Sequence, residues 1–94
     1  MERQTVLIVD DSKLNRMMLM EILGEQYRYI EAQNGREAVR LMEKKLTVDL
    51  MLLDINMPEM NGFQVLEQMN RFRWIDEIPV IMISTDETNY IYLY

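Results

Sequence analysis

A chain of 94 residues, 49% hydrophobic and 28% charged, is long enough for one globular domain and too apolar for a disordered segment. With 16 acidic and 10 basic residues, the formal net charge of −6 disfavours nucleic acid as a partner. Cysteine and histidine are absent, which excludes disulfides, thiolate nucleophiles and imidazole metal ligands.

Short apolar runs alternate with helix-like segments along the chain. In chain order, we expect a strand at 5–9, a helix at 13–23, a strand at 27–32, a helix at 36–45, a strand at 50–53, a helix at 62–72 and a strand at 80–83. Three of these strands are continuous apolar runs, which is typical of strands covered on both faces of a parallel sheet. The strand at 27–32 is more polar, which predicts a sheet edge. This alternation predicts an α/β fold with a doubly wound parallel sheet.

The amino ends of the expected helices carry suitable capping residues, namely Ser12, Asn34 and Asn61. In the first helix, the apolar side chains of Leu14, Met17, Met18 and Ile22 lie near one face. That arrangement is the amphipathic pattern of a helix that packs on a core.

Polar residues end three of the apolar runs: Asp10 and Asp11 end the first, Asp54 the next and Ser84 the last. In a doubly wound sheet, ligands bind beyond the carboxyl ends of the strands, so these residues are expected to converge on one crevice. Three close carboxylates repel one another unless a cation neutralises them, and an all-oxygen set favours Mg²⁺ or Ca²⁺. A carboxylate can also accept a phosphoryl group as a nucleophile.

The sequence at these positions resembles the receiver domain of two-component response regulators. Asp10-Asp11-Ser12 is similar to the acidic pair of that family, and residues 54–62 match its phosphoacceptor pattern D-x-x-M-P-x-M-x-G at every fixed position. Residues 79–84 are similar to its fourth strand and switch hydroxyl. The resemblance extends from residue 4 to about residue 85, and it implies a flavodoxin-like sheet of strand order 2-1-3-4.

The resemblance also implies a role for each matching residue. Asp54 would be the phosphoacceptor, and Ser84 would bind a phosphoryl oxygen as the switch hydroxyl. Asp10, Asp11, Asp54 and the backbone carbonyl of Asn56 would hold Mg²⁺. The implied partner is a sensor histidine kinase or a phosphotransfer protein, and the chain would be a signalling acceptor, not a dedicated enzyme.

After about residue 85, the sequence shows no motif that resembles the later elements of the family. The family continues with a fourth helix, a fifth strand carrying a lysine, and a fifth helix, whereas residues 85–94 include no lysine. A parallel strand needs a crossover of about a dozen residues, so a normal fifth strand does not fit. We therefore expect residues 1–94 to form a single receiver domain that is incomplete at its C-terminus.

Residues 90–94 alternate tyrosine with isoleucine and leucine, which is a strand pattern. Three alternatives remain open for this tail. A turn at 86–89 could lead to a strand running back antiparallel on the fourth strand, the tail could exchange with another molecule, or 86–94 could be the stump of a helix. An exposed fourth-strand edge and this tail would favour a homo-oligomer.

No signal-peptide pattern begins the chain, and no apolar run approaches the roughly 20 residues of a membrane span. We therefore expect a cytoplasmic protein without a membrane partner. Two functions compete, a phosphoacceptor of a phosphorelay and a truncated receiver-like interaction module with an impaired switch. An enzyme that works through an aspartyl phosphate is disfavoured, because Asn56 stands where a second acid would be needed.

Overall fold

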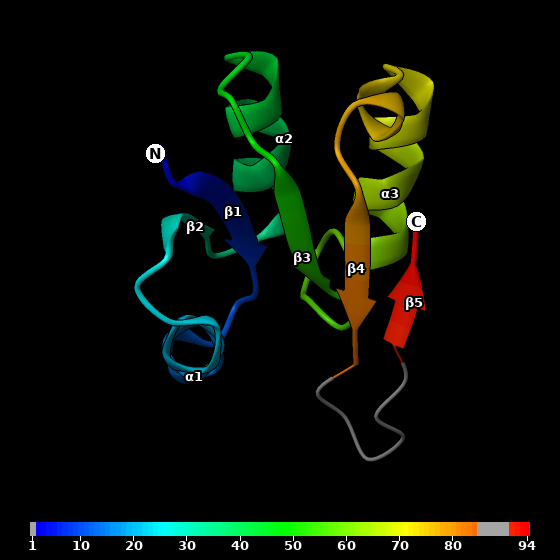
Figure 1. The fold of residues 1–94 in the computed structure, drawn as a ribbon. Helices are drawn as coiled ribbons and strands as arrows, with labels where there is room; N and C mark the ends of the chain where they lie inside the picture. Colours follow the sequence, from blue (N-terminus) through cyan, green and yellow to red (C-terminus); the bar gives the residue numbers. More distant parts are fainter. Residues whose placement is uncertain (1, 85–90) are drawn as a thin grey trace.

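The computed structural model describes residues 2–84 and 91–94, and for residues 91–93 it describes the backbone. Its elements, in chain order, are β1 (Gln4–Val9), α1 (Lys13–Leu23), β2 (Tyr27–Ala32), α2 (Gly35–Glu43), β3 (Leu50–Asp54), α3 (Gly62–Arg71), the 3-10 helix η1 (Trp74–Asp76), β4 (Val80–Ile83) and β5 (Ile91–Leu93) (Figure 1). The expected order of elements up to β4 is confirmed, and η1 is an addition that the sequence analysis did not predict.

The sheet has the strand order β2-β1-β3-β4-β5. The first four strands are parallel, which confirms the expected order 2-1-3-4, and β2 lies at the edge as predicted. The register places Val9 opposite Leu53 and Asp54 opposite Ile83. The carboxyl ends of β1, β3 and β4 therefore lie side by side.

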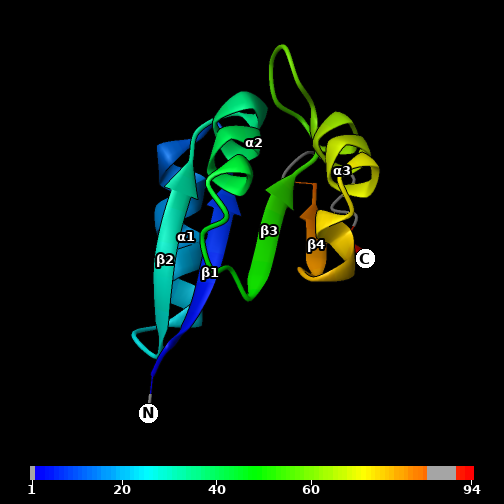
Figure 2. The ribbon, with the colours of Figure 1, turned by 90° about the horizontal axis from the view of Figure 1, so that it is seen from above.

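Helices cover the two faces of the sheet unequally. Of the helices in the described part of the chain, α2 and α3 lie on one face and α1 lies on the other (Figure 2). Alternate residues of the strands point to opposite faces. The face under α2 and α3 buries Leu7, Val9, Met51, Leu53, Val80 and Met82, together with Ala38, Met42, Val65 and Met69 from the helices. The face under α1 buries Val6, Ile8 and Leu52.

The helices begin where the sequence predicted. The side chains of Ser12, Asn34 and Asn61 each accept a hydrogen bond from a backbone N–H in the first turn of the helix that follows. The second helix ends at Glu43, earlier than expected, because Lys45 has a left-handed backbone (φ 56°) that helical residues do not adopt. Among residues 2–84 and 91–94, no helix combines the length and apolar character needed to cross a membrane.

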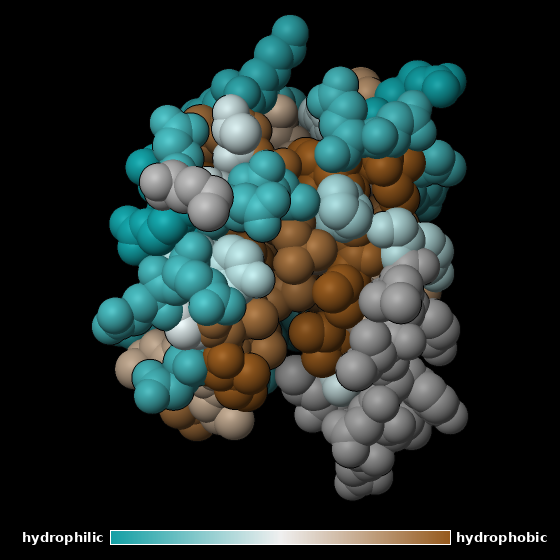
Figure 3. All heavy atoms as spheres, in the orientation of Figure 1, coloured by the Kyte–Doolittle hydropathy of each residue, from teal (hydrophilic) through white to brown (hydrophobic). Residues whose placement is uncertain are grey.

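The apolar face expected on α1 does not pack on the sheet. Leu14, Met17, Met18 and Ile22 are 52–74% exposed, whereas Leu19, Met20 and Leu23 pack against the strands. Apolar residues occur on nearly every side of this helix, so the pattern did not single out the packed side. Figure 3 shows an apolar surface over β3 and β4, with a further apolar area near α1.

The C-terminal residues add a fifth strand to the sheet. In β5, Ile91 pairs with Ile83 and Leu93 with Ile81 in antiparallel register, and Val80 and Tyr94 exchange two backbone hydrogen bonds of 2.7–2.8 Å. The returning strand is therefore confirmed for 91–93 and the helical stump is wrong there, while the expected turn at 86–89 lies outside the described residues. The expected exposed edge of the fourth strand is also wrong, because β5 occupies that edge.

Candidate functional site

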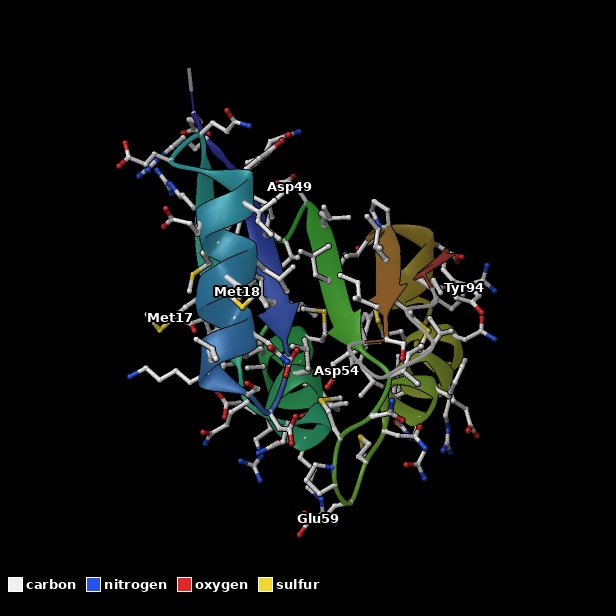
Figure 4. All side chains as sticks on the ribbon, turned by 90° about the horizontal axis from the view of Figure 1, so that it is seen from below. Met17, Met18, Asp49, Asp54, Glu59 and Tyr94 are labelled. Atoms are coloured by element: carbon white, nitrogen blue, oxygen red, sulfur yellow. The ribbon has the colours of Figure 1, made fainter. Side chains whose placement is uncertain are left out.

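The ends of three parallel strands form the candidate site. Asp10 follows the last residue of β1, Asp54 is the last residue of β3, and Ser84 follows the last residue of β4. The backbone N–H of Ile55 donates to the carbonyl of Ile83 over 3.1 Å, which keeps the ends of β3 and β4 together. Figure 4 shows Asp54 at this end of β3 and Asp49 at the other end. The predicted convergence at the carboxyl edge is thus confirmed for the acids.

Three carboxylates meet at this edge. Asp10, Asp11 and Asp54 each offer an oxygen that lies within 4.8 Å of the others. Asp10 and Asp54 are buried, at 2% and 4% exposure, and Asp11 is exposed, so the cluster opens to solvent on one side. This set is made of oxygen donors alone, which suits a hard cation such as Mg²⁺ and fits the ion that the sequence predicted.

Backbone N–H groups hold two of these carboxylates in place. The N–H of Ser12 donates to Oδ1 of Asp10 over 2.9 Å, and the N–H of Asn56 donates to Oδ1 of Asp54 over 3.3 Å. Burial raises the pKa of the Asp10 carboxyl; the hydrogen bond from Ser12 opposes that rise, and the charge of Asp11 adds to it. A bound cation would offset both the cost of the buried negative charge and the repulsion between the carboxylates.

Gly62 brings the start of α3 against the acceptor. A Cβ atom built on Gly62 would overlap the carbonyl oxygen of Asp54 and lie 2.9 Å from Cα of Ile55. The N–H of Gly62 donates to the carbonyl of Ile55 over 2.8 Å, and Asn61 and Gln64 form a capping box that fixes the first turn. A glycine at position 62 therefore lets the helix start close to the acceptor loop.

The roles of two further predicted site residues, Ser84 and Asn56, stay predictions. Ser84 is buried at 6% exposure, and Asn56 is exposed just beyond β3. Trp74 contacts Phe72 at the end of α3, with ring centroids 5.1 Å apart. Because η1 precedes β4, Trp74 lies at the amino ends of the strands, far from the acids.

Arg16 is not among the site residues predicted from the sequence. This residue lies on α1, is 9% exposed, and donates from Nη1 to the backbone carbonyl of Asp10 over 2.6 Å. Its Nε donates to Oε1 of Glu31 on β2 over 2.9 Å. The available signal was a basic residue one turn after Ser12 in a helix that is otherwise mostly apolar.

Comparison with known proteins identifies the family. The family model described as response regulator receiver domain matches residues 6–92, so the chain belongs to this family. It is 32% identical over 85 residues to two-component response regulator ORR5 of Oryza sativa subsp. japonica, covering 89% of this chain and 63% of that regulator. It is 39% identical over 80 residues to a probable cyclic di-GMP phosphodiesterase of Vibrio cholerae, covering 85% of this chain and 18% of that protein.

These two relatives are a response regulator and an enzyme, and this chain spans less than two thirds of the length of each. Among solved structures, it is similar to the response regulator protein TrrA of Thermotoga maritima in complex with Mg²⁺–BeF. That similarity has a TM-score of 0.78 and 29% identity, and it covers 90% of this chain and 72% of TrrA. The receiver fold is therefore shared with a response regulator whose structure was solved with Mg²⁺–BeF.

Proposed function

We propose that this chain accepts a phosphoryl group on Asp54 from a phosphohistidine of a sensor kinase or phosphotransfer protein. The observation that carries the proposal is the cluster of Asp10, Asp11 and Asp54 within 4.8 Å at the carboxyl edge of a receiver fold. The TrrA structure, which contains Mg²⁺–BeF, supports the same chemistry by similarity. This function places the protein in the cytoplasm, where the ATP that charges such kinases is found.

In this proposal, Asp10, Asp11, Asp54 and the backbone carbonyl of Asn56 hold Mg²⁺. When bound, the ion neutralises charge on the phosphoryl oxygens. A carboxylate oxygen of Asp54 attacks the phosphorus, and the new O–P bond forms as the N–P bond of phosphohistidine breaks. The hydroxyl of Ser84, at the adjacent strand end, donates to a phosphoryl oxygen and so couples phosphorylation to β4.

Intact mass after incubation with acetyl phosphate and Mg²⁺ tests the proposal. We expect one added phosphoryl group on the unmodified chain and none on Asp54→Asn. Asp49→Asn is the matched control, because Asp49 lies at the opposite end of the same strand and hydrogen-bonds the backbone of Thr5 over 2.7 Å (Figure 4). A folded, unmodified chain that gains no mass would rule out the proposed phosphotransfer.

A second candidate function is a receiver-like interaction module that associates with itself. The observation that favours it is the exposed apolar side of α1, where Leu14, Met18 and Ile22 are 52–74% exposed at helical spacing. The C-terminal strand adds a further surface, because the outer edge of β5 is the last in the sheet. Such a module would keep the acidic pocket without a working switch.

Particle mass in solution, measured by light scattering after size exclusion, tests the second candidate. We expect a mass above 11.4 kDa for the unmodified chain. The double variant Leu14→Lys/Met18→Lys is expected to be monomeric because it places two charges on the exposed side of α1. A monomeric unmodified chain that is phosphorylated on Asp54 would leave the phosphoacceptor as the sole function.

A further inference from the structure

Arg16 is the one buried basic side chain among the residues that the structure describes, with 9% of its surface exposed. Burying a guanidinium costs free energy unless hydrogen bonds and opposite charge compensate it. The partners of Arg16 are the backbone carbonyl of Asp10 and the carboxylate of Glu31. One of these partners belongs to the acidic pocket, and the other lies on the neighbouring strand.

The contacts of Arg16 leave Asp10 little freedom. The backbone N–H of Asp10 donates to the carbonyl of Ala32 on β2 over 3.1 Å, and the carbonyl of Asp10 accepts from Arg16 over 2.6 Å. Its carboxylate accepts from the N–H of Ser12 over 2.9 Å. Groups from β2, α1 and the turn before α1 therefore fix the amide, the carbonyl and the carboxylate of this one residue.

The ion pair between Arg16 and Glu31 is expected to contribute less than the hydrogen bond from Arg16 to Asp10. The side chain of Glu31 is 43% exposed, and ion pairs with such an exposed partner contribute little to stability. The carbonyl of Asp10, in contrast, belongs to a residue that is 2% exposed and loses a short, charge-assisted hydrogen bond if Arg16 is removed. The hydrogen bond to the carbonyl of Asp10 is therefore the contact of Arg16 that matters for the pocket.

We propose that Arg16 is a positioning residue for the divalent cation of the acidic pocket, because it holds the backbone carbonyl of Asp10 while the carboxylate of the same residue faces the other acids. Residues that orient metal ligands typically change metal affinity by about 10–100-fold when removed. This inference rests on the proposed function, since it assumes that Asp10 binds Mg²⁺.

Calorimetric titration of Mg²⁺ into the folded chain tests this inference without measuring phosphotransfer. We expect Arg16→Met, which keeps length but removes charge and donors, to raise the Kd for Mg²⁺ about tenfold or more. Arg16→Lys keeps the charge and one donor group, so its Kd for Mg²⁺ is expected between that of the unmodified chain and that of Arg16→Met. Glu31→Gln is the control, expected within about twofold of the unmodified chain because only the exposed pair is weakened.

Each outcome decides the inference. A role confined to folding would lower the melting temperature of Arg16→Met and leave the Kd of the folded variant within twofold of the unmodified chain, which would overturn the inference. If Arg16→Met does not fold, Arg16→Lys decides, and a Kd within twofold would overturn it. A folded, unmodified chain that binds no Mg²⁺ would overturn the inference together with the metal site of the proposed function, whereas equal binding by all variants would overturn the inference alone.

Discussion

The two faces of the sheet are made by alternate residues of the same strands, and they are covered very differently. On one face, α2, α3 and η1 close over a continuous core that includes Leu53. On the other face, Leu19, Met20 and Leu23 of α1 pack against the cluster of Val6, Ile8 and Leu52, and among the described residues no second helix adds to this cover, while Ile81 and Ile83 stay partly buried. The acidic pocket joins both faces, since α1 follows Asp11 and α3 begins against Asp54. We call the face under α2 and α3 the closed face and the face under α1 the open face. Stability should come mainly from the closed face, and contact with other molecules should come mainly from the open face.

Leucines at adjacent positions of β3 give the sharpest test of this difference. Leu53 is fully buried on the closed face and Leu52 is 5% exposed on the open face. Truncating a buried leucine to alanine lowers the free energy of unfolding by about 2–5 kcal/mol, and the loss is smaller where the surroundings can relax into the cavity. We expect Leu53→Ala to lie at the high end and Leu52→Ala at the low end, measured by urea unfolding. Equal losses would mean that the two faces are equally packed.

The contact between α3 and the acceptor tests how the closed face supports the pocket. In Gly62→Ala, the added Cβ would overlap the carbonyl oxygen of Asp54, so either the helix or the strand end must shift. We expect a loss of about 1–3 kcal/mol in the free energy of unfolding, with slower phosphorylation by acetyl phosphate. Glu67→Ala, an exposed change on the same helix, is the control and should alter neither quantity.

The buried carboxyl of Asp10 makes stability depend on pH. Because burial raises its pKa in the folded chain above the ordinary value of 3.8, the folded state is penalised for carrying the charge. The penalty is full above the raised pKa and disappears as the pH falls through that pKa toward 3.8. Without Mg²⁺, we expect Asp10→Asn to be more stable than the unmodified chain at pH 7, with a smaller difference at pH 4.5.

Added Mg²⁺ should reverse this ranking at pH 7, because a cation stabilises only the chain that keeps the carboxylate. Urea midpoints at the two pH values, with and without Mg²⁺, measure the effect. A variant that is less stable than the unmodified chain at pH 7 without Mg²⁺ would show that the carboxylate of Asp10 is already compensated by its neighbours, Arg16 and Ser12 among them.

Most of the fold and the acids of the site could be predicted from the sequence, because both depend on local signals. Continuous apolar runs specify buried parallel strands, and the polar residues that end them must lie at one edge of the sheet. The acceptor segment at 54–62 is specific enough to identify the family, which the match over residues 6–92 confirms.

Tertiary contacts that leave no periodic signal could not be predicted. The first helix carries Leu19, Met20 and Leu23 as well as the apolar residues that remain exposed, so composition alone allowed more than one packed side. The bond from Arg16 to the Asp10 carbonyl joins a side chain to a backbone atom, and only the packing of α1 on the sheet brings the two together. The short η1 helix has no apolar period of its own.

Ile22 and Leu23 on α1 give the smallest expected effect and the most direct comparison within one helix. Ile22 is 74% exposed, so Ile22→Ser should change the free energy of unfolding by no more than about 0.5 kcal/mol. Leu23 packs against the open face of the sheet, so Leu23→Ser should cost about 1–3 kcal/mol through lost burial. Both changes are measured by urea unfolding at a concentration where the chain is monomeric. A large loss for Ile22→Ser at that concentration would mean that the exposed side of α1 is covered within the monomer, and the open face would then not be available to another molecule.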